Sequence, residues 1–294
     1  MNHAAQPELT RWRAREHRRE VAFQLIGALV VMLAMLILTV LLVKILVDGF
    51  ARLGWDFFNQ FASRFPERAG IKAALVGSLY LMLLTAAIAV PIGVGAAVYL
   101  EEFARRNWWT RLIEINITNL AGVPSIIYGL LGLQVFVRML WMDRSLIAGA
   151  CTLVLLILPI IITAAREGLR TVPNIIRYGS LALGATQWQT VRYTVLPVAL
   201  PSILTGVILS VSRAIGETAP LLVIGAYVYI TRLPDSLTAP FTTLPVQIYD
   251  WISRPQTSFH QNASAGIIVL LILLLSLNAV AIYLRNRFQK RLVL

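Results

Sequence analysis

The sequence predicts an all-α polytopic membrane protein with about six transmembrane helices. Of its 294 residues, 58% are apolar, and the mean hydropathy of +0.74 lies outside the range of soluble globular domains. Several apolar runs are long enough to cross a bilayer, so burial in lipid replaces a soluble core. The formal net charge of +12 does not indicate a nucleic-acid partner, because most basic residues cluster beside the apolar runs, as topology signals do.

Six apolar runs satisfy the length criterion for a membrane span. They are Ala22–Leu46, Ala73–Leu100, Ile115–Val137, Ser145–Ala165, Val198–Ile230 and Ala263–Leu284. A basic leader, residues 1–20, precedes the first run. Residues 21–47 are too long for the apolar part of a signal peptide and lack a small-residue cleavage site, so we expect them to remain as the first transmembrane helix. The fifth run is too long for one straight crossing, which indicates a tilt, a kink or an interfacial start.

The basic residues outside the spans favour a cytoplasmic location for both termini. With the N-terminus inside, 16 Lys and Arg residues lie on the cytoplasmic side and 8 lie outside. Residues 287–294 then form a cytoplasmic tail, and residues 48–72 form a periplasmic segment. In the second long outer segment, residues 231–262, we expect residues 245–252 to form a short amphipathic helix on the membrane surface.

The sequence carries no sign of a catalytic, metal or cofactor site. Its one cysteine, Cys151, cannot form a disulfide within the chain or a structural zinc site. The histidines His3, His17 and His260 lie outside the spans and share no ligand spacing. A glycine-rich ATP-binding loop and a nucleophile–base set are also missing. We therefore expect no enzymatic activity, no cofactor and no metal in this chain.

The loop between the fourth and fifth spans, residues 166–197, has the pattern of a helix–turn–helix. Pro173 can begin a first helix, and Gly184 allows a sharp turn because glycine reaches backbone angles that other residues avoid. A second short helix is expected over residues 186–193, before Pro197 opens the fifth span. Such a unit can transmit a push from a cytoplasmic partner, or it can lie as an ordinary amphipathic loop on the lipid surface. The spacing alone leaves both interpretations open.

Two full charges, Arg213 and Glu217, interrupt the fifth apolar run. On a continuous helix they would share one stripe with Ser210 and Pro220. Pro220 cannot donate to the carbonyl of Gly216, so that oxygen would face water or a neighbouring helix. Charges inside a span are costly and usually functional. The guanidinium suits phosphate oxygens, and the carboxylate can accept a hydrogen bond from a protonated phosphate. The alternative is a salt bridge that only holds helices together.

These motifs resemble those of the ABC-importer permeases. Gly184 is followed thirteen residues later by the proline of Leu196-Pro197, which resembles the loop by which such permeases dock into an ATPase. The sequence Ser212-Arg-Ala-Ile-Gly-Glu-Thr-Ala-Pro-Leu-Leu222 is more specific and resembles the PstA permease family of phosphate-specific importers. Residues 122–132 and 244–249 are similar to the same family. The chain departs from the family loop at residues 178–180, which read Tyr-Gly-Ser where Glu-Ala-Ala is common, so a carboxylate that could bond a partner is absent.

The resemblance implies a permease fold over residues 73–286 in a bacterial inner membrane. It implies a translocation pathway with Arg213, Glu217, Ser210 and Gly216, and ATPase coupling through Leu183, Gly184, Ala185, Trp188, Leu196 and Pro197. It also implies four partners: a PstC-like sister permease, a PstB-like cytoplasmic ATPase dimer, a PstS-like periplasmic phosphate-binding protein and the lipid membrane. ATP hydrolysis and tight phosphate capture would then belong to other chains.

Phosphate import is the function that the resemblance favours over three alternatives. A permease for another oxyanion, molybdate or sulfate, would share the fold, although the Glu217 acceptor favours a protonatable ligand. An ion-coupled secondary transporter would need inverted repeats and broken helices with ion ligands, and no repeat is apparent. A membrane enzyme would need a catalytic constellation that the sequence lacks.

Overall fold

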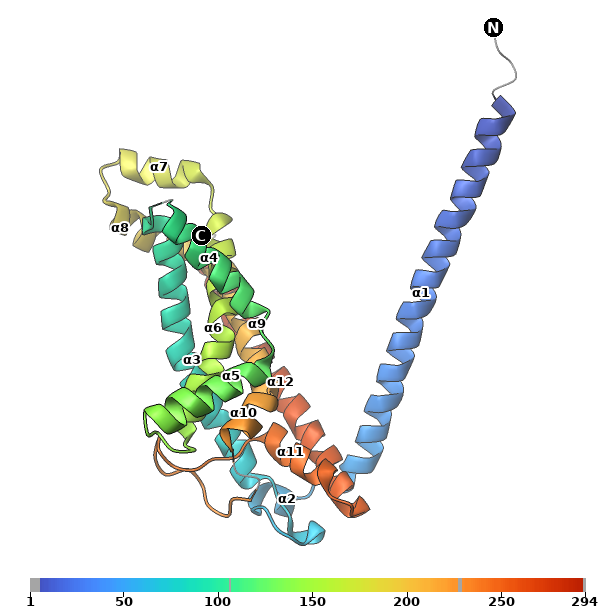
Figure 1. The fold of residues 1–294 in the computed structure, drawn as a ribbon. Helices are drawn as coiled ribbons and strands as arrows, with labels where there is room; N and C mark the ends of the chain where they lie inside the picture. The colour runs from blue at the N-terminus through green and yellow to red at the C-terminus, as the bar shows by residue number, and fades with distance from the viewer. Residues whose placement is uncertain (1–5, 106, 227–228, 293–294) are drawn as a thin grey trace.

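The computed structural model describes residues 6–105, 107–226 and 229–292, and it confirms the all-α fold (Figure 1). His3, the start of the predicted leader and the last two residues of the predicted tail lie outside these ranges. The α-helices of the described part are α1 (Gln6–Phe50), α2 (Trp55–Asn59), α3 (Lys72–Val98), α4 (Trp108–Ala121), α5 (Ser125–Gly132), α6 (Leu146–Arg170), α7 (Asn174–Ala182), α8 (Gln187–Thr190), α9 (Leu196–Gly216), α10 (Ala219–Ile224), α11 (Leu244–Ser253) and α12 (Thr257–Leu292). Shorter helical segments of other pitch are η1 (Pro66–Arg68), η2 (Tyr99–Phe103), η3 (Leu133–Met139) and η4 (Val191–Val195).

The prediction of about six spans is confirmed, with one of them sharply bent. In the described part of the chain, five segments are long and apolar enough to cross a membrane: Arg19–Phe50, Lys72–Phe103, Leu146–Arg170, Gln187–Gly216 and Thr257–Arg287. The pair Trp108–Ala121 and Ser125–Met139 makes a sixth if its two halves, bent by 104°, count as one span.

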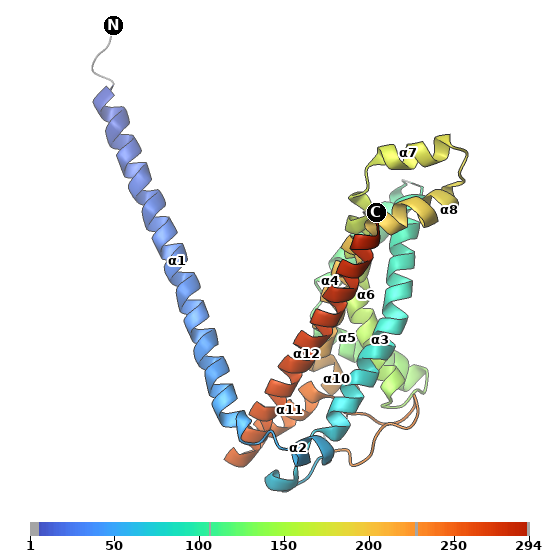
Figure 2. The ribbon, with the colours of Figure 1, turned by 180° about the vertical axis from the view of Figure 1, so that it is seen from behind.

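The helices give the molecule two distinct ends (Figures 1 and 2). At the loop end, α7 projects beyond the spans and α8 lies level with the end of α3, and α1 begins and α12 ends on the same side. At the opposite, far end lie α2, α11 and the beginnings of α3 and α12. Helix α6 is central and packs against α3, α4, α5 and α9, and fifteen of its residues are buried. The core of the bundle therefore lies along α6.

Helix α1 stands apart from this bundle. In both views it diverges from α12 toward the loop end, and the apolar window of its span is 0% buried. The two helices meet near Gly49, where a Cβ atom would lie 2.6 Å from the backbone nitrogen of Ala265. Only glycine permits this approach, because any larger side chain would displace the backbone of α12.

The bend between α4 and α5 follows from the segment Gly122-Val-Pro124. Proline has no N–H to donate to the carbonyl of Leu120, four residues earlier, so α4 ends and α5 starts in a new direction. Val123 N–H, at 3.1 Å, and the hydroxyl of Tyr128, at 2.7 Å, donate to that carbonyl instead. The hydroxyl thus stabilises the bend, and Tyr128 is 4% exposed.

The fifth span is also broken, which agrees with its excess length. Helix α9 ends at Gly216, and α10 begins at Ala219 and ends before Gly225, whose φ of +91° is left-handed. The α5 and α10 segments pack against each other, and a Cβ atom on Gly129 would lie 2.7 Å from Cα of Pro220. Two broken spans therefore support each other inside the bundle. The predicted end of the span at Ile230 is wrong, because the helix ends at Ile224.

The predicted helix at residues 245–252 exists as α11, but its predicted place on the membrane surface is wrong. Its side chains Leu244, Val246 and Trp251 are at most 1% exposed, and even Gln247 is 2% exposed. Helix α11 packs against α12 and α3, and Trp251 contacts Phe57 of α2 with ring centroids 5.9 Å apart. The far end thus has a small core of its own, which the amphipathic pattern of one segment could not reveal.

Candidate functional site

The turn between α7 and α8 is built by local rules that the sequence displays. Gly184 has a φ of +87°, and its N–H donates to the carbonyl of Leu181 at 3.0 Å, while Ala185 N–H donates to that of Ser180 at 3.3 Å. These two bonds are the Schellman motif that ends a helix at a left-handed residue. Thr186 then forms a capping box with Gln189 and starts α8. The predicted helix–turn–helix is confirmed, with Pro173 as the N-cap of α7.

The tip of this loop exposes large apolar side chains. The exposed fraction is 91% for Leu183, 77% for Ile175, 66% for Tyr178 and 56% for Trp188. In agreement with this, none of the residues of α7 is buried. Exposed apolar side chains gathered at one end of a molecule are typical of a protein–protein contact. Helix α7 of this loop projects beyond the spans in Figures 1 and 2 and lies across them rather than along them.

The six predicted coupling residues fall into two groups. Leu183, Gly184, Ala185 and Trp188 lie together in the turn and in α8, and all but Ala185 are exposed. Leu196 and Pro197 are half-buried and open α9, which continues from η4 without a break. The turn group is therefore at the surface, and the second group lies where the loop passes into the fifth span.

The charged pair Arg213 and Glu217 lies at the break between α9 and α10. Nε of Arg213 is 3.4 Å from Oε1 of Glu217, and the two side chains are 52% and 16% exposed. The predicted continuous helical stripe is wrong, because Glu217 has φ −74° and ψ 120° and lies outside the helix. Pro220 removes one intrahelical donor, and Glu217 N–H bonds to Ala214 in a final tight turn.

The other two residues of the predicted pathway lie close by in different surroundings. Ser210 is 1% exposed, and its hydroxyl donates to the carbonyl of Gly206 at 2.8 Å, so it is bonded within α9. Gly216 is exposed, and no atom lies within 4 Å of the position that a Cβ would take. The open space of the break is thus beside Gly216 and Arg213. Among the described residues, no three His, Cys, Asp or Glu side chains gather to hold a metal ion.

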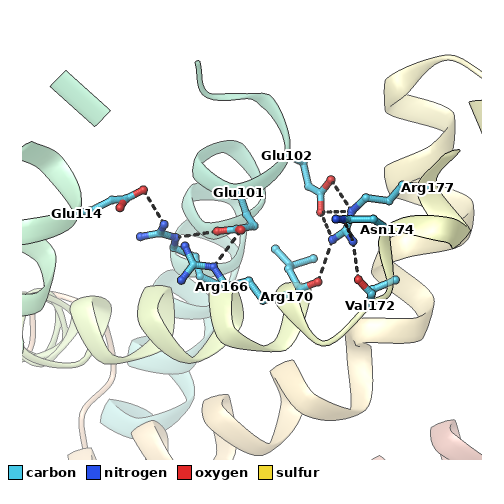
Figure 3. A network of polar contacts seen from close by, with 9 residues as sticks. Glu101, Glu102, Glu114, Arg166, Arg170, Val172, Asn174 and Arg177 are labelled. Carbon is cyan, nitrogen blue, oxygen red and sulfur yellow. Dashed lines mark hydrogen bonds and ion pairs between the residues drawn. The ribbon is translucent and has the colours of Figure 1, made fainter. Parts of the chain in front are cut away.

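A network of ion pairs at the loop end was missed by the sequence analysis (Figure 3). Glu101 of η2 bonds Nε of Arg166 at 3.3 Å and Nε of Arg170 at 2.9 Å. Glu114 of α4 bonds Nη2 of Arg166 at 2.6 Å. Glu102 bonds Nη2 of Arg177 at 2.7 Å. In the sequence these arginines were interpreted only as topology signals. The available clue to their partners was the pair of adjacent glutamates, Glu101 and Glu102, that follows the second apolar run.

The comparisons with known proteins agree on one family. Residues 89–294 match the family described as "Binding-protein-dependent transport system inner membrane component". The "Phosphate transport system permease protein PstA 1" of Mycobacterium tuberculosis (strain CDC 1551 / Oshkosh) is 34% identical over 236 residues, which cover 80% of this chain and 77% of that protein. The "Phosphate transport system permease protein PstA" of Haemophilus influenzae (strain ATCC 51907 / DSM 11121 / KW20 / Rd) is 34% identical over 260 residues, 85% of this chain and 87% of that protein.

Two solved transporters share the fold at low sequence identity. An inward-facing structure of the MetNI methionine ABC transporter aligns with a TM-score of 0.61 and 19% identity, over 73% of this chain and 94% of that one. A bacterial ABC transporter involved in the import of the acidic polysaccharide alginate aligns with a TM-score of 0.63 and 14% identity, over 94% of this chain and 98% of that one. From its fold, its family match and these relatives, the chain belongs to the inner-membrane permease components of binding-protein-dependent ABC transporters, which are not themselves catalytic.

Proposed function

We propose that this chain is the permease subunit of an ATP-driven importer of inorganic phosphate and forms half of its translocation pathway. Relatives that are 34% identical over most of their length are phosphate transport permeases. The observation in this chain that carries the proposal is the Arg213–Glu217 pair beside an open helix break.

The exposure of Arg213 supports a pathway along this face of α9. Its side chain is 52% exposed, although it belongs to a segment that is long and apolar enough to cross a membrane. A charged side chain facing lipid in this part of a span is costly, so such residues face water or another protein segment. We infer that a sister permease covers this face and that the anion passes between the two subunits.

The chemistry of the pair suits phosphate in particular. The planar guanidinium offers paired donors to two oxygens of a tetrahedral anion. The carboxylate of Glu217 can accept a hydrogen bond from a protonated phosphate, which fully ionised sulfate or molybdate cannot donate. Glu217 also offsets the positive charge of Arg213, so the anion is not held too tightly for release.

The proposed partners follow from the same features. A cytoplasmic ATPase dimer would dock on the apolar tip formed by Ile175, Tyr178, Leu183 and Trp188. Because Tyr178 replaces the common glutamate, this contact would rest on shape and apolar burial rather than on a carboxylate. Gly184 and Ala185 would set the angle of the tip, and Leu196 and Pro197 would pass its movement into α9. A phosphate-binding protein would deliver the anion at the far end.

Reconstituted vesicles test the proposed substrate. The complex of this chain with its sister permease and ATPase is expected to accumulate labelled phosphate when ATP and the binding protein are supplied. Excess sulfate or molybdate should not compete, because neither presents a proton to Glu217. The Glu217→Gln variant should lose part of this discrimination, because the amide keeps an acceptor but also offers an NH2 donor to a fully ionised oxygen. Uptake of sulfate or molybdate in place of phosphate by the parent complex would instead establish the other-oxyanion alternative.

We further propose that the loop end faces the cytoplasm, with both termini on that side. The basic residues favour this orientation, and an ATPase can reach the loop only from inside. In a Cys151→Ala background, cysteines in place of Asn59 and Ser236, both exposed, should react with an impermeant thiol reagent added outside. A cysteine in place of Trp188 should react only after permeabilisation. Labelling of position 188 in intact spheroplasts would reverse the orientation and remove the ATPase-docking argument.

A further inference from the structure

The segment η2 joins the second span to the end of α6 and to both helices of the 166–197 loop, α7 and α8. Its Glu101 side chain bonds Arg166 and Arg170 at the end of α6. The carboxylate of Glu102 bonds Arg177 of α7, and the backbone carbonyl of Glu102 accepts a hydrogen bond from Gln187 of α8. Phe103 contacts the ring of Trp188, with centroids 6.3 Å apart. Three consecutive residues therefore hold three different helices.

Arg177 is the central member of these contacts (Figure 3). Its Nε lies 3.2 Å and 3.3 Å from the two oxygens of Glu102, and its Nη2 lies 2.7 Å from one of them. The same guanidinium donates to the carbonyl of Val172 at 2.6 Å and to that of Leu169 at 2.9 Å, where α6 ends. The side chains of Arg177 and Glu102 are only 16% and 8% exposed. Such a shielded, multiply bonded pair is stronger and more rigid than a surface ion pair.

The attachment of α7 depends on this pair because α7 has little core of its own. Helix α7 has no buried residue, and Ile176 is a half-buried apolar contact to the bundle. The hydroxyl of Ser180 in α7 contacts the hydroxyl of Thr190 in α8 at 3.0 Å, but this contact joins two parts of the same loop and does not attach α7 to the bundle. The Glu102–Arg177 bond, by contrast, connects α7 to the α3–η2 span, which packs along α6 and α9.

We propose that Glu102 and Arg177 are positioning residues that transmit movement of the 166–197 loop into the second span. Without the pair, α7 would keep its chain connections to α6 and, through α8 and η4, to α9, together with the Ile176 contact, but it would have no ion pair to the α3–η2 span. With the pair, α3 moves together with α7, so a single movement of the loop reaches three spans, those of α3, α6 and α9. This inference rests on the proposed function in requiring an ATPase that moves the loop.

The test is the coupling ratio, the amount of anion transported per ATP hydrolysed, measured on the whole complex in vesicles. Glu102→Gln removes the charge of the side chain and keeps its shape. It should lower the coupling ratio about tenfold, which is the size of effect that loss of a hydrogen bond to a charged group produces. The ATPase subunit should still co-purify, because the apolar tip of the loop is unchanged. Glu102→Asp keeps the charge and should recover part of the ratio. The matched control is Asp250→Asn, which breaks the half-buried Asp250–Arg254 pair at the far end, 2.8 Å long, and should leave the ratio unchanged.

A distance measurement separates this inference from the choice of substrate. Spin labels on cysteines replacing Gly95 of α3 and Gly179 of α7, where a Cβ meets no atom within 4 Å, report the separation of the two helices in a Cys151→Ala background. Binding of ATP should leave that distance unchanged in the parent and shift it in Glu102→Gln, whichever anion is carried. The proposal is overturned if the shift is absent, if Asp250→Asn lowers the ratio equally, or if Glu102→Gln prevents assembly and thus serves folding alone.

Discussion

Exchange of the two charges at the helix break, Arg213→Glu with Glu217→Arg, is expected to abolish phosphate uptake while the complex still assembles. The exchange retains an ion pair, since the side chains lie 3.4 Å apart. It moves the guanidinium from the exposed side of α9 to the less exposed place of the Glu217 carboxylate, 3.4 Å away. A misplacement of about 1 Å in a positioned group can cost about a hundredfold in rate, so uptake should fall at least that far.

Single substitutions of the same pair should separate charge from shape. Arg213→Lys keeps the charge and loses the planar fork, so uptake should fall while insertion persists. Glu217→Gln keeps an acceptor but no longer offsets Arg213, and it should slow release more than entry. Each is measured as energised uptake in vesicles, normalised to assembled complex. The corresponding exchange at the far end, Asp250→Arg with Arg254→Asp, is the control and should be tolerated. If the exchanged 213–217 pair transports like the parent, the pair is a structural salt bridge and the anion passes elsewhere.

The second large effect is expected from Gly184→Val, which should uncouple ATP hydrolysis from uptake. Space is not the obstacle, because no atom lies within 4 Å of the added Cβ. The obstacle is the φ of +87°, which costs a residue with a side chain about 1–2 kcal/mol and a β-branched residue more. Relief of that strain would break the Schellman bonds and rotate the exposed tip. A change of about 1.4 kcal/mol corresponds to a tenfold change in an equilibrium or a rate, so coupled uptake should fall about tenfold.

The matched control for this effect is Gly179→Val in the same loop. Gly179 also has open space around its Cβ position, but it lies inside α7 without a positive φ. Valine is therefore accommodated there, and uptake and binding-protein-stimulated ATPase activity should remain near those of the parent. Equal losses in both variants would assign the effect to the added side chain, and unchanged activity in Gly184→Val would reject the turn as a coupling element.

The parts of the fold that the sequence predicted are those governed by local rules. The spans follow from apolar length, and the loop follows from Pro173 and Gly184, each of which acts on residues within one or two turns. The capping box at Thr186, which the structure adds, acts over the same short range. The excess length of the fifth run indicated a tilt, a kink or an interfacial start, and the structure has a break. The place of Glu217 outside the helix was missed, because the break depends on α5 as well as on Pro220 and is therefore a tertiary feature.

The misses at both ends of the molecule have the same physical origin. The pairs Glu101–Arg166 and Glu102–Arg177 join residues 65 and 75 positions apart, so no periodicity within one helix reveals them. Likewise the polar face of α11 indicated a water-facing surface, but α12 and α3 cover that helix and bury Gln247. The coupling and pathway residues named from the sequence were found through motif resemblance, and their roles stay predictions until the variants above are measured.

The mutual packing of α5 and α10 also bears on how the chain enters the membrane during synthesis. With six residues, α10 is too short to cross a bilayer, and it cannot be inserted as a span of its own. Its place against Gly129 exists only if α5 has been made and held at its bend, some ninety residues earlier in the chain. We therefore expect the insertion machinery to release the third and fifth segments together, late in translation. A chain truncated before α10 would leave α5 exposed and become a substrate for membrane proteases.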